Sequence, residues 1–246
     1  RYVPMILPDG SWLHGINDAS VRIGLRLSKD ETIVRTPFEV RHMGSKYPIF
    51  SFDFIGAKKG ILPTSYDYLR LEGRMQYRLN LPPVGYSRLM LEGGKIFGKV
   101  PYLLLKLHEG NGTYFYDRYA FSCMNFYEFS SDAWISFFYE HHFNGFLLGR
   151  VPLLKKLNWR EVFVFKGVYG TLSARNDGSL PNTKAVMLFP VGMSSVEHPY
   201  LETGFGIENI FRLLRVDCIW RLTHHRAVPG LSIPTFTVNF SLNLKF

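Results

Sequence analysis

The end of the chain alternates between apolar and polar side chains without a break. From Phe236 to Phe246, every even-numbered residue is apolar and every odd-numbered residue is polar or charged. This period of two is that of a β-strand with one face against an apolar medium. As a free edge in water such a strand would promote aggregation, whereas a strand that closes a barrel in a bilayer has no free edge. The pattern predicts a closing barrel strand whose lipid-facing residues are Phe236, Val238, Phe240, Leu242, Leu244 and Phe246.

The same alternation recurs along the chain, most clearly over residues 66–81. One face of that segment is apolar, and the other contains Arg70, Glu72, Arg74 and Arg78. A face with several ionised groups cannot pack into a dry core, because each unpaired buried charge is costly, but a wet or ion-paired lumen accepts it. We therefore expect an all-β fold, a transmembrane antiparallel β-barrel. A soluble β-sandwich is the alternative, and it does not accommodate this charged face.

The order of strands and connections is typical of outer-membrane barrels. Residues 1–20 show no period and are interpreted as a connector, and residues 21–246 as the barrel. Long loops are expected at 99–132 and 173–199, whereas the connections on the opposite rim are mostly short turns. About ten strands are expected, at residues 21–28, 33–43, 50–54, 66–81, 86–98, 133–146, 160–172, 200–208, 213–225 and 236–246.

Composition narrows the classes of function. The formal net charge is +9, but the basic residues alternate along strands instead of forming a patch, so nucleic acid is not an expected partner. Aromatic residues make up 16% of the chain, which fits the aromatic girdles of a barrel. Cys123 and Cys218 form neither a disulfide framework nor a metal-type spacing. No metal and no cofactor are predicted.

Charged residues on the polar faces of the predicted strands are expected to face the lumen. We interpret them as a ladder of charges that fills or wets the interior; a selectivity lining for anionic solutes is the alternative. Arginines are the larger group, but acidic residues offset most of their charge. The predicted set is Arg22, Arg26, Asp53, Arg70, Glu72, Arg74, Arg78, Arg88, Glu92, Glu140, Glu202, Glu208, Arg215, Asp217 and Arg221.

The most enzyme-like cluster is Glu140–His141–His142. Lipid hydrolases at a barrel wall use a serine and a histidine that meet. Ser136 and His142 share a strand face, but six residues of strand separate them by about 20 Å. No catalytic residue is therefore predicted, and Glu140 is interpreted as a lumenal partner of strand arginines.

Three stretches carry a family resemblance: SKYPIFSFDF at 45–54, the segment from YLRLEGRMQYRLN to GNGTYFYD at 68–117, and GFGIENIFRLLRVDCIWRLTH at 204–224. They resemble the C-terminal barrel of an uncharacterised outer-membrane family from Bacteroidetes, whose members usually carry an N-terminal carboxypeptidase-regulatory-like domain. The resemblance implies that this chain is the C-terminal part of a larger barrel. The sequence from Arg1 shows no signal-peptide pattern. We therefore expect either that a signal peptide was cleaved upstream or that this sequence is part of a longer chain.

A more distant likeness is to the surface-antigen superfamily, the barrels of outer-membrane assembly factors and two-partner secretion transporters. The strand ISFFYEHHFNG at 135–145 resembles the superfamily's strand with an inward glutamate, here Glu140. The preceding loop, LHEGNGTYFYDRY at 107–119, lies where the superfamily has a glycine- and arginine-containing element folded into the lumen. This loop has Gly110, Gly112 and Arg118 but no Arg-Gly pair.

These resemblances imply a non-enzymatic protein of the Gram-negative outer membrane, acting in envelope assembly or as a subunit of an outer-membrane complex. The alternatives are a pore or transporter for small solutes and an outer-membrane lipid hydrolase. Expected partners are outer-membrane lipid and lipopolysaccharide, the barrel assembly machinery, and other outer-membrane proteins or lipoproteins.

Overall fold

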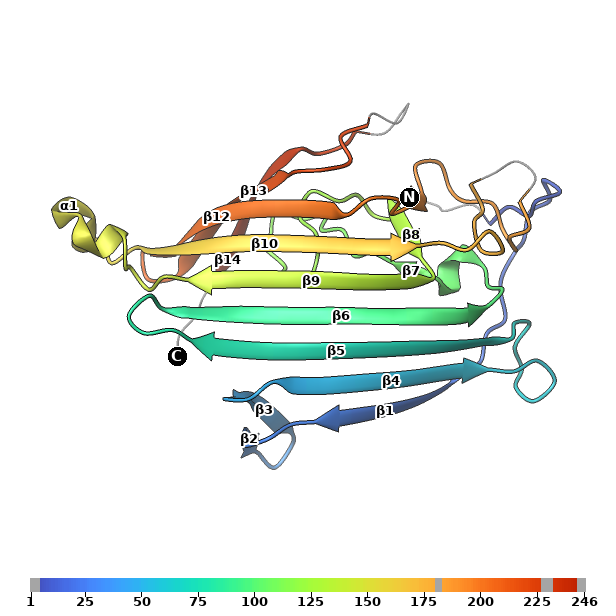
Figure 1. Cartoon of the computed structure of the whole chain (residues 1–246), viewed down its shortest axis with the longest axis horizontal. Helices are drawn as coiled ribbons and strands as arrows, with labels where there is room; N and C mark the ends of the chain where they lie inside the picture. Colours follow the sequence, from blue (N-terminus) through green and yellow to red (C-terminus); the bar gives the residue numbers. More distant parts are fainter. Residues whose placement is uncertain (1–4, 180–182, 227–231, 243–246) are drawn as a thin grey trace.

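The computed structural model describes residues 5–179, 183–226 and 232–242, and they form an all-β protein (Figure 1). Its main element is a nine-stranded antiparallel sheet with the order β1-β4-β5-β6-β9-β10-β12-β13-β14. Each strand thus pairs with the preceding and the following strand of the sheet, as in a meander. The strands are β1 (Val21–Leu27), β4 (Ile49–Ala57), β5 (Tyr68–Asn80), β6 (Tyr86–Gly98), β9 (Ala133–His142), β10 (Arg160–Thr171), β12 (Tyr200–Ile210), β13 (Leu214–Arg221) and β14 (Phe236–Leu242).

Smaller elements lie at the ends of this sheet. A two-stranded hairpin and a three-stranded sheet account for the remaining strands. No helix of the described residues has the length and hydrophobicity needed to cross a bilayer. The small elements are β2 (Glu31–Arg35), β3 (Val40–Ser45), η1 (Tyr102–Leu104), β7 (Lys106–Leu107), β8 (Phe129–Ser131), η2 (Leu148–Arg150), α1 (Pro152–Lys155) and β11 (Ser194–Ser195).

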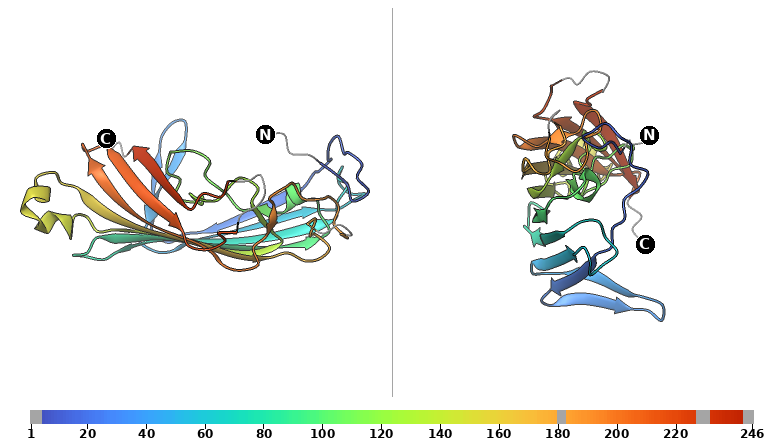
Figure 2. Two further views of the ribbon diagram at one scale, coloured as in Figure 1. Left: turned by 90° about the horizontal axis from the view of Figure 1, so that it is seen from above. Right: turned by 90° about the vertical axis from the view of Figure 1, so that its right-hand side faces the viewer.

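The main sheet is curved, and residues 108–128 lie over its concave side (Figure 2). We call this segment the inner loop and the face beneath it the inner face. The prediction of an antiparallel all-β architecture is confirmed, but within the described residues the sheet is not closed, and β1 and β14 are its two edges. A barrel therefore remains a prediction.

The inner loop occupies part of the free edge of β14. The amide of Phe240 donates to the carbonyl of Tyr114, and the amide of Tyr116 donates to the carbonyl of Phe240, both at 2.7 Å. Asn239 adds a bond from Nδ2 to the carbonyl of Thr113 at 3.1 Å. The inner loop thus forms hydrogen bonds with part of the backbone edge of the predicted closing strand.

One predicted strand was wrong. Residues 33–43 form not one strand but most of the β2–β3 hairpin, which stands apart from the main sheet. Pro37 lies in its turn, where the amide of Thr36 donates to the carbonyl of Glu39 at 2.8 Å. A proline cannot donate to a ladder, so it breaks a run of alternating residues into two short strands.

Other boundaries differ by a few residues. The predicted strand 213–225 ends at Arg221, and the connection at 147–159 contains η2 and α1. Within the predicted long loop at 99–132, residues 108–128 contain no strand, and β8 begins at Phe129. Leu244 and Phe246 of the predicted closing strand lie outside the described residues.

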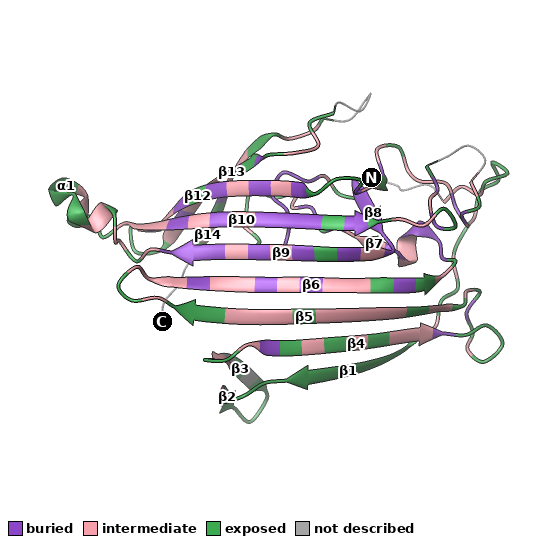
Figure 3. Cartoon of the chain, in the orientation of Figure 1, coloured by how far each residue is buried: buried purple, intermediate pink, exposed green. Residues whose placement is uncertain are grey.

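Burial separates the two faces of the sheet. Residues paired across antiparallel strands point to the same face, so the register assigns every side chain. The outer face is exposed although it is apolar: Ile23 is 66% exposed, Phe205 59% and Ile135 48%. The inner face is covered over β9, β10 and β12, where purple predominates in Figure 3.

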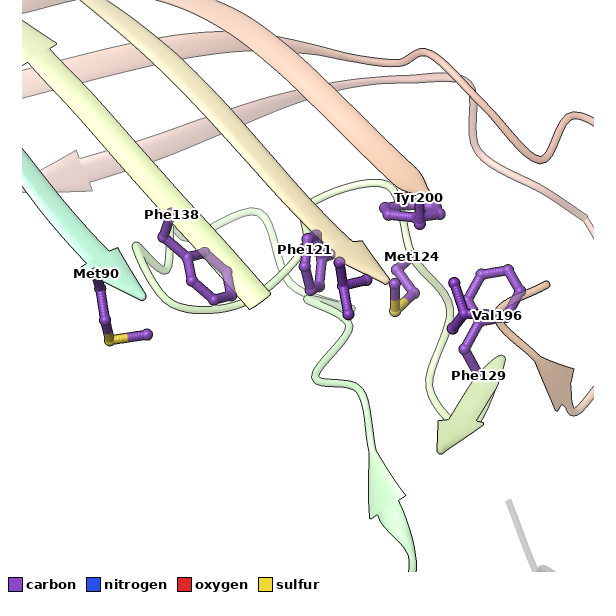
Figure 4. Close-up of a cluster of buried hydrophobic side chains, with 8 residues drawn as sticks. Met90, Phe121, Met124, Phe129, Phe138, Val196 and Tyr200 are labelled. Carbon is purple, nitrogen blue, oxygen red and sulfur yellow. The ribbon is translucent and has the colours of Figure 1, made fainter. Parts of the chain in front are cut away.

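The inner loop packs on the sheet through an apolar cluster (Figure 4). The ring of Phe121 lies between those of Phe138 on β9 and Tyr200 on β12, at centroid distances of 5.1 and 5.3 Å. Met124 extends the cluster toward Phe129 on β8. Burial of these side chains stabilises the loop against the sheet, because apolar area leaves water.

Candidate functional site

The predicted charged residues all lie on the inner face. Residues that are paired directly on neighbouring strands lie on the same face of the sheet. Among the predicted residues, Arg74 is paired with Glu92, Arg88 with Glu140, and Glu202 with Arg221. Because residues two apart along a strand share a face, the remaining members follow. That this face lines a lumen stays a prediction.

Glu140 is the centre of a buried polar network between β9, β13 and the inner loop. It is 2% exposed. One carboxylate oxygen accepts from the Tyr116 hydroxyl at 2.7 Å and from Arg215 at 3.1 Å. The other accepts from Nε of Arg118 at 2.6 Å. The loop thus docks on Glu140 through Arg118, although it lacks the Arg-Gly pair of the resembled element.

Arg215 on β13 belongs to the same network. Its guanidinium binds Asp217 with two bonds, Nε to Oδ2 at 2.7 Å and Nη2 to Oδ1 at 2.8 Å. It also lies over the Tyr116 ring, 4.4 Å from the centroid. Burial and the negative charge of Glu140 raise the pKa of the Tyr116 phenol well above its ordinary value. Tyr116 therefore stays a hydrogen-bond donor at physiological pH.

Lys166 holds the middle of the inner loop. It is 1% exposed, and its Nζ donates to the carbonyls of Asp117 at 2.8 Å and Ala120 at 2.5 Å. The sequence prediction missed this residue, because β10 is apolar on both faces around Val162–Phe165. The available signal was its even spacing from the inner-face residues Val162 and Val164.

Glu202 and Arg221 hold the end of the inner loop. Glu202 accepts from the amides of Ser122 at 2.8 Å and Cys123 at 2.7 Å. Arg221 binds Glu128 through Nη2 at 2.6 Å and donates to the carbonyl of Cys123 at 3.2 Å. Charged strand residues here serve as anchors for loop backbone, which a strand pattern alone does not reveal.

Two titratable groups of this region are kept neutral. Burial, followed by the charge of Glu202, raises the pKa of the Cys123 thiol to about 12. Burial lowers the pKa of His108 to about 3, and its Nε2 is 2.9 Å from the hydroxyl of Ser131. Neither group is charged at physiological pH, so the thiol is not a ready nucleophile.

Away from the inner loop, the predicted charges form more exposed pairs. Arg22 binds Asp53 at 2.8 Å, and Arg26 binds Glu31 at 2.5 Å. Arg70 pairs with Glu72, and Arg74 binds Glu92 at 2.6 Å. Arg78 and Arg88 make no ion pair with a described residue and lie over the ring of Tyr86.

A serine–histidine contact that the sequence did not reveal joins β6 to β9. The hydroxyl of Ser87 is 2.8 Å from Nδ1 of His141, and Nε2 of His141 is 3.0 Å from the carbonyl of Val84. Both side chains are buried, and the histidine contacts a carbonyl rather than a carboxylate. In the described part of the chain, Ser87 is therefore not an accessible nucleophile, and no acidic group takes the third position of a hydrolase triad.

Ser136 and His142, the serine and histidine considered in the sequence analysis, are not in contact. His142 is 3.1 Å from Glu208 and stacks on Tyr86 at a centroid distance of 4.5 Å, whereas Ser136 lies opposite Glu92 in the register. In the described parts of the chain, no group of three or more His, Cys, Asp or Glu side chains forms a metal site.

The fold and inner face define an antiparallel all-β protein whose exposed outer face is apolar and whose inner face is charged. Residues 15–174 match the C-terminal domain of a family of unknown function, DUF5686. The chain belongs to this family. Membership in an uncharacterised family was expected from the sequence; the Bacteroidetes origin and the N-terminal domain remain predictions.

A solved structure with a similar fold is that of BamA from Haemophilus ducreyi lacking POTRA domains 1–3. The TM-score is 0.51 at 9% sequence identity, over 92% of this chain and 42% of that chain. The chain thus spans less than half the length of that structure, and the likeness concerns the fold alone. No curated protein matches the sequence.

Proposed function

We propose that the protein is an integral, non-enzymatic β-barrel protein of the outer membrane that acts in envelope assembly or as a subunit of an outer-membrane complex. The main observation in support is the exposed apolar outer face of the sheet. Ile23 on β1, Ile135 on β9 and Phe205 on β12 are all about half exposed or more. An apolar surface that runs across a whole sheet is unfavourable in water and favourable against lipid.

Strand length supports the same proposal. β5 and β6 each contain 13 residues. At about 3.3 Å per residue and a tilt of about 45°, such a strand spans about 30 Å, the thickness of the hydrocarbon core. Expected partners are outer-membrane lipid and lipopolysaccharide on the outer face, the barrel assembly machinery during insertion, and proteins or lipoproteins of the same membrane.

The docked inner loop favours an assembly or subunit role over an open pore. Glu140, Lys166 and Glu202 hold it with bonds of 2.5–2.8 Å, and all three are buried. Over β9 to β13 the loop fills space on the inner face that a conducting pore would use. The hydrolase alternative loses support because, among the residues that the structure describes, no acidic side chain contacts the buried Ser87–His141 pair.

The first test is fractionation of native membranes, followed by purification of the full-length protein in mild detergent and identification of copurifying proteins. We expect recovery from the outer membrane with stable partners. Recovery from the soluble fraction would contradict the barrel. A partner-free monomer with single-channel conductance would favour the pore instead.

Spin labels test the lipid-facing surface directly. In a background with Cys123→Ala and Cys218→Ala, labels at Phe54→Cys and Phe205→Cys report the outer face, and Gln76→Cys is the matched inner-face control. In liposomes, the outer labels should collide with oxygen and the inner label with a water-soluble nickel complex. Equal access of nickel to all three would refute the proposed membrane-facing surface.

A further inference from the structure

A cavity of about 920 Å³ lies on the inner face at the end of the sheet where β5 turns into β6. Its floor is formed by residues of β5, β6 and β9. The β2–β3 hairpin and the inner loop, which both rise from the concave side of the sheet, form its walls (Figure 2). A volume of this size is typical of sites for small organic ligands.

The lining of the cavity carries both signs of charge, and it contains the arginines of the inner face that form no ion pair with a described residue. Among the predicted inner-face arginines, only two make no ion pair with a described residue, and both Arg78 and Arg88 line this cavity. The others pair with Asp53, Glu31, Glu72, Glu92, Asp217, Glu140 and Glu128. Lys46 adds positive charge to the lining. Of the three carboxylates there, Glu31 is paired with Arg26 and Glu140 with Arg118, and Asp30 is the third.

One aromatic ring fixes the position of both unpaired guanidinium groups. Cζ of Arg78 is 4.2 Å and Cζ of Arg88 is 5.3 Å from the centroid of Tyr86. Tyr86 is in turn stacked on His142. Two like charges held beside one ring repel each other, and Arg88 is half buried. A bound anion would offset this repulsion.

We propose that this cavity binds a phosphorylated sugar, with the phosphate held by Arg78 and Arg88. Guanidinium groups match phosphate oxygens in a bidentate geometry. Gln76, Asn80 and Tyr119 supply polar and aromatic surface for the sugar in the remaining volume. The ligand is either a soluble phosphorylated sugar or the phosphorylated sugar headgroup of a lipid. The site does not require membrane insertion, so its test is independent of the proposed function.

Calorimetry on the full-length protein in detergent tests the site with glucose 1,6-bisphosphate as the probe and unphosphorylated glucose as the control ligand. The double variant Arg78→Gln/Arg88→Gln should weaken binding of the bisphosphate at least tenfold. Arg22→Gln is the matched control, because Arg22 lies on the same face, is exposed and pairs with Asp53. It should change binding by less than twofold.

A second arm distinguishes the two sources of the ligand. A phosphorylated glycolipid with acyl chains short enough to keep it soluble is compared with glucose 1,6-bisphosphate. Tighter binding of the glycolipid identifies a lipid headgroup as the ligand. Tighter binding of glucose 1,6-bisphosphate identifies a soluble sugar phosphate. Binding of glucose as tight as the bisphosphate, binding that survives the double variant, or no binding of either phosphate would overturn the site. If the double variant fails to fold, the exposed single variant Arg78→Glu replaces it, with the same expected loss.

Discussion

The two halves of the inner face share one sequence pattern but differ in environment. Over β9 to β13 the inner loop covers the sheet, and Glu140, Glu202 and Asp217 are at most 2% exposed. Over β1 to β5 no loop of the described residues covers the comparable positions, and the side chain of Arg22 is 64% exposed (Figure 3). The alternation of charges determines which face a residue takes, whereas the loop determines whether its charge is buried.

This difference has energetic consequences. In the covered half, removal of one partner leaves a charge without water or counter-ion, which is strongly destabilising. In the open half, water screens each pair and replaces a lost partner. Equivalent substitutions in the two halves should therefore have very different effects.

The largest effect is expected for Glu140→Ala. The change leaves Arg215 and Arg118 without this carboxylate and removes the acceptor of the Tyr116 hydroxyl. Loss of one partner of a buried ion pair costs about 3–5 kcal/mol. Urea titration of the full-length protein in detergent measures the free energy of unfolding. A loss no larger than that of Asp53→Ala in the open half would refute the comparison.

Lys166→Met tests the anchoring of the inner loop. Methionine keeps the length and apolar stem of the side chain but loses both bonds to the carbonyls of Asp117 and Ala120. We expect a loss of about 2–3 kcal/mol, typical of bonds from a charged group, and faster proteolysis within residues 108–128. An unchanged cleavage rate would mean that the apolar cluster around Phe121 holds the loop without Lys166. Lys95→Met, on the outer face, is the control.

His108 provides a pH-dependent test of burial. Its pKa is about 3 in the folded protein, against 6.5 for the free side chain. Between these values the unfolded chain binds a proton that the folded protein does not, so stability falls as pH falls. From pH 7 to pH 5 this contribution amounts to about 2 kcal/mol. It should be absent from His108→Gln, and identical pH profiles of the two proteins would show that His108 is accessible to water.

Much of the sheet could be predicted from the sequence, because strand alternation is a local property. Glu140 and Arg215 were assigned to one face from their polar positions alone. Their contacts with Tyr116 and Arg118 could not be predicted, since these depend on the path of a loop distant in sequence. Lys166 was missed because loop side chains, not water, cover the inner face of β10, so its neighbours are apolar there too.

The smallest effect is expected in the open half, for the pair of Arg22 and Asp53. The bond of 2.8 Å joins side chains that are 64% and 24% exposed. Water screens such a pair and solvates either residue when its partner is lost. A double-mutant cycle with Arg22→Gln and Asp53→Asn should therefore give a coupling energy within the error of urea titration. A clear coupling energy in the full-length protein would mean that another part of that protein covers β1 and β4. The two halves of the inner face would then be equally buried.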